Sequence, residues 1–445
     1  MGRKGVKLGV AVMLAGICFC QAGVAEEKKF DFGASLRLRQ EYFENIWDFN
    51  AKSTTFQPVD NYFRLKASLW GKFNITDNIS LFAKLTTEPD IYMTTGPNSP
   101  LSKGKNVNDN EGIFDNLYLD VKNILGLPLD LRVGRQDFLF TYGEGFIILD
   151  GTPYDGSRTT YFNAAKLTWK INEKNSLDFL FISDPDRDIY LPVINDLGRQ
   201  LNTSDERAYV LYGKLKPTAN FSLEPYYIYK TEGSYTKKAI YTPTLGLNTF
   251  GARAVLSWDT WKIRGELAGQ NGEYTGGRDR EGLGGYAYLT KSFPTFLFKP
   301  SLDVGFAYLS GDDPTTTNKH EGWDPIFSRW PWISELYLFA YAVEGGEPAY
   351  WTNTLLYRTN LSLALSPKVK LDLAYNYLRA NENGPNPVFF GTGKERGHLP
   401  QCILNWKLNK NIDGHLWVEY FIPGDYHVGT DASLMLRWQC QLRWP

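Results

Sequence analysis

Apolar and polar side chains alternate along most of this chain, in segments of about ten residues. Residues 34–39 place alanine and leucine at even positions and serine and arginine at odd ones. Residues 434–444 repeat the pattern, with leucine, tryptophan and cysteine alternating with arginine and glutamine at most odd positions. A period of two indicates a β-strand with one apolar and one polar face. We predict eighteen such strands after residue 30.

The connections between these strands are short and long by turns. The short ones are residues 74–78, 123–128, 171–175, 217–220, 259–260, 292–297, 366–367 and 409–414. The long ones are residues 44–61, 89–113, 137–160, 184–206, 231–247, 271–283, 310–352, 380–399 and 423–431. This rhythm is typical of a bacterial outer-membrane barrel, which has tight periplasmic turns and longer outer loops. We therefore expect an all-β fold, an 18-stranded antiparallel transmembrane barrel.

The N-terminal residues 1–25 have the pattern of a secretory signal peptide. Arg3, Lys4 and Lys7 precede a twelve-residue apolar stretch, and Ala25 ends a run of small residues. That stretch is too short to span a membrane as a helix. We expect cleavage after residue 25, export to the outer membrane of a Gram-negative cell, and one barrel domain over residues 26–445.

Composition agrees with a barrel. The chain has 13 Trp, 27 Tyr and 27 Phe, a mean hydropathy of −0.34 and a net charge of −1. Alternating lipid-facing and lumen-facing positions average out hydropathy, and aromatic residues form girdles at the two membrane interfaces. Lipid and lipopolysaccharide are therefore the expected surroundings. The near-zero net charge gives no reason to expect a nucleic-acid partner.

Two cysteines, Cys402 and Cys440, lie beyond the signal peptide. Both fall on the apolar face of their strands, and one whole strand separates them. Strands are about 4.8 Å apart, so the two Cα atoms should lie about 10 Å apart, farther than a disulfide spans. We predict two free thiols.

The polar face predicts the lining of the lumen. Its basic residues are Arg37, Arg39, Arg64, Lys66, Lys72, Lys84, Arg132, Lys166, Lys214, Lys230, Arg253, Lys262, Arg264, Arg358, Lys370, Lys407, Arg437 and Arg443. Its acids are Glu41, Glu88, Asp120, Asp130, Asp178, Glu224, Glu266, Asp303, Asp372 and Glu419. Two interpretations stay open. The charges pair across strands, as Arg264 with Glu266 would, or the basic excess selects anions as charged rings do in channels.

Three segments resemble the alginate export family of outer-membrane barrels. They are residues 132–161, RVGRQDFLFTYGEGFIILDGTPYDGSRTTY, residues 323–341, WDPIFSRWPWISELYLFAY, and residues 419–427, EYFIPGDYH. The resemblance implies an 18-stranded conduit for an anionic polysaccharide, with periplasmic export components as partners. It also implies that Arg135 and Arg158 join Arg37 and Arg39 in the basic lining. Strand parity points Arg135 toward lipid, so either a β-bulge re-aims it or it lies beyond the membrane band.

Two loop segments have alternative interpretations. Asp184, Asp186 and Asp188 offer oxygen ligands, but they lack the glycine and glutamate spacing of a calcium loop. A solvated acidic loop, or one bridged to lipopolysaccharide by divalent ions, is favoured. Residues 323–351 are rich in Trp and Tyr, which either stack on sugar rings or pack an inward-folded loop; packing is favoured.

Rival functions are an outer-membrane enzyme and a small-solute porin. An enzyme needs a nucleophile–base pair or paired carboxylates, and the only candidate group is Asp312, Asp313 and His320. No catalytic residues, cofactor or metal site are expected. An anion-selective porin has the same fold and differs only in cargo. We expect a channel for anionic solutes, with polysaccharide export preferred and the porin as the alternative.

Overall fold

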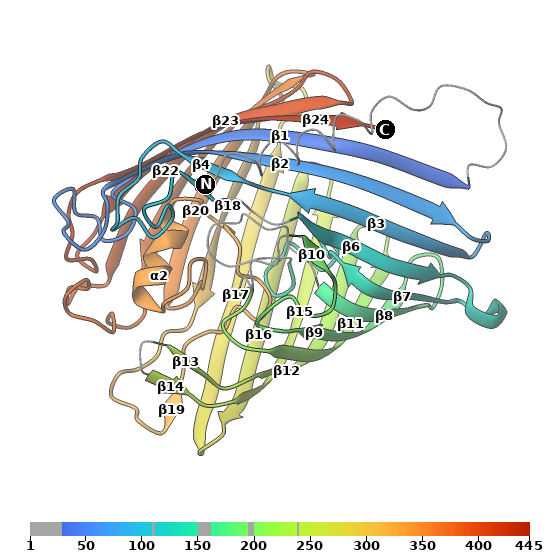
Figure 1. The fold of residues 1–445 in the computed structure, drawn as a ribbon, viewed down its shortest axis with the longest axis horizontal. Coiled ribbons are helices and arrows are strands. Elements are labelled where there is room, and N and C mark those ends of the chain that lie inside the picture. The colour runs from blue at the N-terminus through green and yellow to red at the C-terminus, as the bar shows by residue number, and fades with distance from the viewer. Residues whose placement is uncertain (1–28, 109–111, 150–161, 195–199, 238–239) are drawn as a thin grey trace.

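The computed structural model describes residues 29–108, 112–149, 162–194, 200–237 and 240–445, and within them eighteen strands close into one antiparallel barrel (Figure 1). Each strand pairs with the next along the chain, and the last pairs with the first through Leu38 opposite Cys440. The barrel strands are β1 (Phe30–Glu44), β2 (Val59–Asn74), β3 (Ile79–Thr87), β6 (Gly112–Val121), β7 (Leu129–Gln136), β8 (Phe162–Lys170), β9 (Ser176–Asp184), β11 (Glu206–Thr218), β12 (Phe221–Glu232), β15 (Leu245–Trp258), β16 (Trp261–Tyr274), β17 (Arg278–Ser292), β18 (Ser301–Leu309), β20 (Thr354–Ser366), β21 (Val369–Arg379), β22 (Glu395–Lys407), β23 (Ile412–Pro423) and β24 (Ser433–Trp444). The predicted fold class is confirmed.

The predicted connections agree with the structure within three residues at each end, with two exceptions. The connection predicted over residues 380–399 ends five residues earlier, because β22 begins at Glu395. Residues 271–283 were expected to form a long loop, but β16 and β17 continue to Tyr274 and from Arg278, leaving a three-residue turn. Gly276 and Gly277 have φ angles of 119° and 85°, which only glycine adopts without strain. The polar ends of β16 and β17 remain hydrogen-bonded to each other at the loop end of the barrel. These residues therefore form strand although they do not alternate between apolar and polar.

The remaining elements lie in the loops. They are β4 (Asp90–Tyr92), β5 (Val107–Asn108), η2 (Ile124–Gly126), β10 (Val193–Ile194), β13 (Tyr235–Lys237), β14 (Ile240–Thr242), β19 (Lys319–His320), η3 (Tyr337–Phe339) and α2 (Ala340–Glu344). Across the described residues, none of the helices is long and apolar enough to span a membrane. Figure 1 shows α2 among the loops at the left end of the barrel, opposite the short turns.

The outer face of the wall is apolar, as the alternation predicts. Exposed residues include Leu69 and Leu373, each 38–40% accessible, and Phe250 at 55%. Cys402 lies opposite Val418, and Cys440 lies opposite Gly414, both on the intervening strand β23. Both cysteines are free. The prediction of two unpaired thiols on strands separated by one strand is therefore confirmed.

The buried core fills the loop end of the barrel. One large cluster joins inward wall residues such as Phe43, Tyr212 and Tyr286 to loop residues such as Trp323 and Tyr341, all less than 5% exposed. A barrel of this size has room for loops inside it. The apolar residues in the described parts of the loops are buried there against aromatic wall residues.

Candidate functional site

Residues 310–353 fold into the barrel and are referred to as the constriction loop. Lys230 of β12 donates to the Ile326 carbonyl at 2.9 Å, and Gln270 of β16 donates to the Asp324 carbonyl at 2.8 Å. On the other wall, Gln401 of β22 donates to the Ile333 carbonyl at 2.8 Å. The loop therefore extends through the lumen from β12 and β16 to β22.

A second loop meets the constriction loop inside the barrel. Phe327 exchanges backbone hydrogen bonds with residues 147 and 149, of 3.0 and 3.2 Å. The indole of Trp330 donates to the Gly145 carbonyl at 3.0 Å. Residues 137–149 therefore brace the constriction loop, and together the two loops narrow the pathway.

Glu144, from this second loop, forms ion pairs with two of the predicted lumen arginines. Its carboxylate lies 3.0 Å from Arg253 and 2.9 Å from Arg264. Arg253 also donates to Glu224 at 2.9 Å, and Arg264 donates to Asp303 at 2.6 and 2.9 Å. The predicted pair of Arg264 with Glu266 is wrong. Glu266 instead accepts from tyrosine hydroxyls on β12 and β17, each at 3.0 Å, which already satisfy its oxygens.

A dense network of charges lines β1 and β2. Arg37 pairs with Glu88, which also lies 3.8 Å from Lys66. Arg64 donates to Asp90 at 3.2 Å and lies 3.4 Å from Glu41. Three cations thus share two inward glutamates and one aspartate of the short strand β4. These residues face inward as predicted, but their charge is largely compensated.

Arg39 and Arg437 lie on the same wall, where β1 meets β24. Arg39 donates to the amide oxygen of Gln439 at 2.8 Å, and its closest carboxylate, Glu41, is 3.6 Å away. Arg437 pairs with Glu41 and, at 2.6 Å, with Glu335 of the constriction loop. Arg39 therefore keeps more uncompensated charge than its neighbour.

Arg358 and Lys166 face the lumen without a carboxylate. Arg358 donates to the amide oxygens of Asn376 and Gln401 at 3.0 and 3.3 Å. Neither cation has an ion-pair partner among the residues that the structure describes. Arg132, next to Lys166 across the ladder, is bound by both oxygens of Asp120 at 2.7 and 2.9 Å.

Arg135 does not face the lumen. Its ladder partner is Leu117, which shares a face with the 38%-exposed Leu119, so parity places it on the outer side as anticipated. It lies at the loop end of β7, where Asp188 binds the guanidinium at 2.5 and 2.9 Å and leaves the residue 2% exposed. Of the two alternatives, a β-bulge or a position beyond the membrane band, the structure therefore favours the second: Arg135 lies where β7 meets the loops. Arg158 lies outside the described residues.

The loop acids are the part of the site that sequence reasoning missed. Asp90, Asp115, Glu144 and Glu335 all contact inward cations, at 2.6–3.2 Å. Asp115 is the extra residue of a β-bulge in β6, and the other three lie outside the barrel strands. Strand parity cannot place such residues, so the predicted basic excess was too large.

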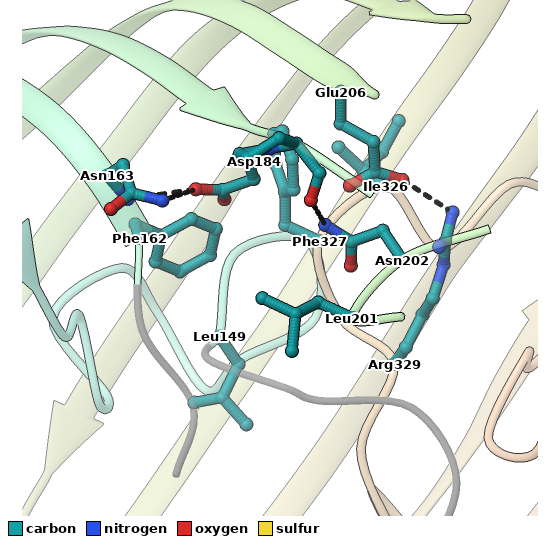
Figure 2. Close-up of a pocket in the computed structure, with 11 residues that line it drawn as sticks. Leu149, Phe162, Asn163, Asp184, Leu201, Asn202, Glu206, Ile326, Phe327 and Arg329 are labelled. Atoms are coloured by element: carbon teal, nitrogen blue, oxygen red, sulfur yellow. Dashed lines mark hydrogen bonds and ion pairs between the residues drawn. The ribbon is translucent and has the colours of Figure 1, made fainter. Parts of the chain in front are cut away.

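The small cavity in Figure 2 lies where the acidic segment around Asp184 meets the constriction loop. It is lined by Leu149, Phe162, Asn163, Asp184, Pro185, Leu201, Asn202, Glu206, Ile326, Phe327 and Arg329. Asp184 accepts two hydrogen bonds from Asn163, at 2.8 and 3.1 Å, and Asp188 pairs with Arg135. No group of three or more His, Cys, Asp or Glu suited to a metal occurs in the described ranges.

The aromatic residues of the constriction loop mainly pack. Trp323, Tyr337, Tyr341 and Trp351 are at most 3% exposed. Trp323 stacks on Phe146 with centroids 5.2 Å apart. Their burial favours the packing interpretation over sugar stacking.

The candidate acid–base group lies in the outer part of the same loop. His320 Nδ1 is 3.6 Å from Asp312 and also contacts Arg280. Burial, followed by the positive charge of Arg280, lowers the pKa of His320 to about 2. The imidazole is therefore neutral near pH 7 and is a poor proton donor.

Comparisons with known proteins identify the fold. A sequence model of the alginate export family matches residues 28–438. A comparison with curated proteins gave no match. Among solved structures, the chain resembles Pseudomonas aeruginosa OccK9 (OpdG), with a TM-score of 0.59 and 12% identity over 93% of this chain and 98% of that one. It also resembles a BenF-like porin from Pseudomonas fluorescens Pf-5 (TM-score 0.57, 11% identity, 93% and 98% covered) and P. aeruginosa OpdK with vanillate (0.55, 11%, 93% and 98%). The fold is that of outer-membrane porins.

Proposed function

Because this chain belongs to the alginate export family and has the fold of outer-membrane porins, we propose that it is a channel for anionic solutes. Export of an acidic polysaccharide, alginate or a related polymer, is the preferred cargo. On this proposal, the polymer enters from periplasmic export components at the short-turn end and leaves between the outer loops.

One observation carries the proposed charge preference. Arg39, Lys166 and Arg358 face inward from three different parts of the wall. Lys166 and Arg358 have no ion-pair partner in the described chain, and the nearest carboxylate to Arg39, that of Glu41, is 3.6 Å away and is shared with Arg64 and Arg437. Uncompensated cations in a narrow lumen with low-dielectric walls attract anions and repel cations. Arginine also binds planar carboxylates through two parallel hydrogen bonds. The paired cations around Glu88 and Glu144 add less to this field.

The alternative, an anion-selective porin for small solutes, is favoured by the constriction loop. The loop crosses the lumen and packs large aromatic residues into it. OpdK, one of the structurally similar proteins, was crystallised with vanillate, a small carboxylate. A lumen narrowed in this way suits a small acid without rearrangement, whereas a polymer needs an extended path past both loops.

Current block in planar lipid bilayers distinguishes the two cargoes. The wild-type channel is exposed on the short-turn side to polymannuronate and to neutral dextran of equal length. The export proposal predicts concentration-dependent block by polymannuronate and at least tenfold weaker block by dextran. Equal indifference to both polymers, together with current carried by small carboxylates, would favour the porin. Block by both polymers to the same extent would contradict a charge-selective pathway.

A further inference from the structure

The wall formed by β1, β24 and β23 carries a group of inward hydrogen-bond donors that we term the donor patch, comprising Arg39, His415, Trp417, Arg437 and Gln439. Arg39 lies opposite Gln439, which lies opposite His415. In the next row, Arg437 lies opposite Trp417. Two adjacent rows of the barrel wall thus bring these side chains to one place.

Several donors of the patch have no partner in the described part of the chain. They are Arg437 Nε, Trp417 Nε1 and His415 Nε2, the last a donor in one tautomer of the ring. The Arg437 guanidinium lies 5.3 Å from the Trp417 ring centroid, and the rings of His415 and Trp417 are 5.9 Å apart. Buried polar groups in native proteins are nearly always paired. Several unpaired donors in one place indicate a binding site for a hydrogen-bond acceptor, and the chain itself satisfies only some of these donors.

The acceptor that the chain does supply is Glu335 of the constriction loop. Its carboxylate lies 2.6 Å from Arg437 Nη1. The Glu335 side chain is 18% exposed, whereas Glu41, the wall residue that also binds Arg437, is 1% exposed. Glu41 is thus a permanent partner, while Glu335 approaches from the lumen side.

The backbone at Glu335 is held independently of its side chain. Glu419 of β23 accepts hydrogen bonds from the backbone N–H groups of Glu335 and Leu336, at 3.0 and 3.1 Å, and from the Ser334 hydroxyl. The Glu335 carboxylate can therefore turn away from Arg437 while the loop stays in place. Exchange of this one carboxylate requires no opening of the barrel.

We propose that the donor patch is a binding subsite for the carboxylate of a sugar acid of the hexuronate type, and that Glu335 occupies it when no solute is bound. The incoming carboxylate replaces Glu335 at Arg437, gains Arg39 as a second cation and accepts from the free donors of His415 and Trp417. The Trp417 ring offers the pyranose an apolar face beside the cations. This inference rests on the proposed function, since it names a solute class and a subsite within the same channel.

The test is block of the single-channel current by short uronate oligomers in wild type, Glu335→Gln and Glu321→Gln. Glu335→Gln removes the competing charge, so the concentration for half-block should fall on the order of fivefold, the lower end of typical coupling between sites. Glu321→Gln is the matched control, because Glu321 lies in the same loop, pairs with Lys319 at 2.7 Å and does not contact the patch. It should leave the half-block concentration unchanged.

A second variant tests the other side of the subsite. Trp417→Phe keeps an aromatic ring at this position and removes the indole N–H donor, so it should raise the half-block concentration for uronate oligomers. Neutral glucose oligomers should show no change in any variant. Equal half-block concentrations in wild type and Glu335→Gln, or an equal shift for the neutral oligomers, would overturn the subsite. The proposed function fails separately, if the wild-type channel prefers cations.

Discussion

Arg396 of β22 donates to both carboxylate oxygens of Glu344 in α2, each at 2.8 Å. The arginine is fully buried, and its guanidinium also donates to the Asn353 carbonyl and to the Tyr337 hydroxyl. This bidentate pair fixes the end of the short helix of the constriction loop against the barrel wall. The position of the loop thus depends on one buried ion pair as well as on its aromatic packing.

Replacing Glu344 by Gln should loosen the constriction loop. Removing one partner of a buried ion pair costs about 3–5 kcal/mol because the other charge stays buried without compensation. We expect faster hydrogen exchange of residues 336–345 and a noisier, larger single-channel current. Glu382→Gln is the control, since Glu382 and Lys394 form a half-exposed pair at 3.4 Å, worth about 0–1 kcal/mol. Unchanged exchange in Glu344→Gln would show that packing alone holds the loop.

The two thiols should report the lipid-facing side of the wall. Cys402 and Cys440 lie on β22 and β24 with β23 between them, and their ladder neighbours include the exposed, outward-facing Val418. We expect two reactive thiols per molecule with a lipid-soluble maleimide and slower reaction with a charged, membrane-impermeant one. Mass spectrometry of the labelled protein measures both. A native disulfide between these cysteines is incompatible with this strand register.

Outer-loop packing should weaken in acid because of His427. Its ring is buried among Phe49, Tyr337 and Phe421, and its Nε2 lies 3.1 Å from the Tyr337 hydroxyl. Burial, and then the charge of Arg396, lowers the pKa of His427 well below its usual value. Below about pH 6.5, His427 therefore binds a proton more readily in the unfolded loop than in the folded one. The folded loop is fully stable above that pH and loses stability as the pH falls below it.

Between pH 7 and pH 5, protonation of this one histidine in the unfolded loop lowers the stability of the folded loop by about 2 kcal/mol. Limited proteolysis of the outer loops in detergent, measured against pH, should show this loss in wild type. His427→Gln should flatten the pH dependence, whereas His398→Gln, which changes a partly exposed ring, should retain it. A wild-type rate that does not rise below pH 6 would contradict this role of His427.

The wall was predictable from sequence and the loops were not. Alternation with a period of two depends on each strand having one lipid face and one lumen face, so strand number, closure and the outward Cys402 and Cys440 follow from local pattern. Glu144 and Glu335 reach the lumen only because their loops fold inward, and that depends on tertiary packing around Trp323 and Tyr341. The sequence pattern does not predict the hairpin at Gly276, because the ends of β16 and β17 extend beyond the lipid and need no apolar face there.

The same limit explains the candidate site. Arg64, Arg253 and Arg264 face inward as parity predicts, but their partners Asp90 and Glu144 lie outside the barrel strands. Arg39 and Arg358 keep their charge because amide oxygens, and not carboxylates, accept from them. Which inward cations stay uncompensated is therefore a property of the loops, and only the structure distinguishes them.

The reversal potential across a planar bilayer under a potassium chloride gradient tests the central claim most directly. If inward cations select anions, the wild-type channel prefers chloride over potassium, and the combined variant Arg39→Gln, Lys166→Gln and Arg358→Gln shifts the reversal potential toward cation selectivity. Arg207→Gln, which removes one exposed positive charge near the outer rim of β11, should leave it unchanged. A wild-type channel that prefers potassium would contradict the account, because the inward arginines and lysines would then serve only as partners for carboxylates.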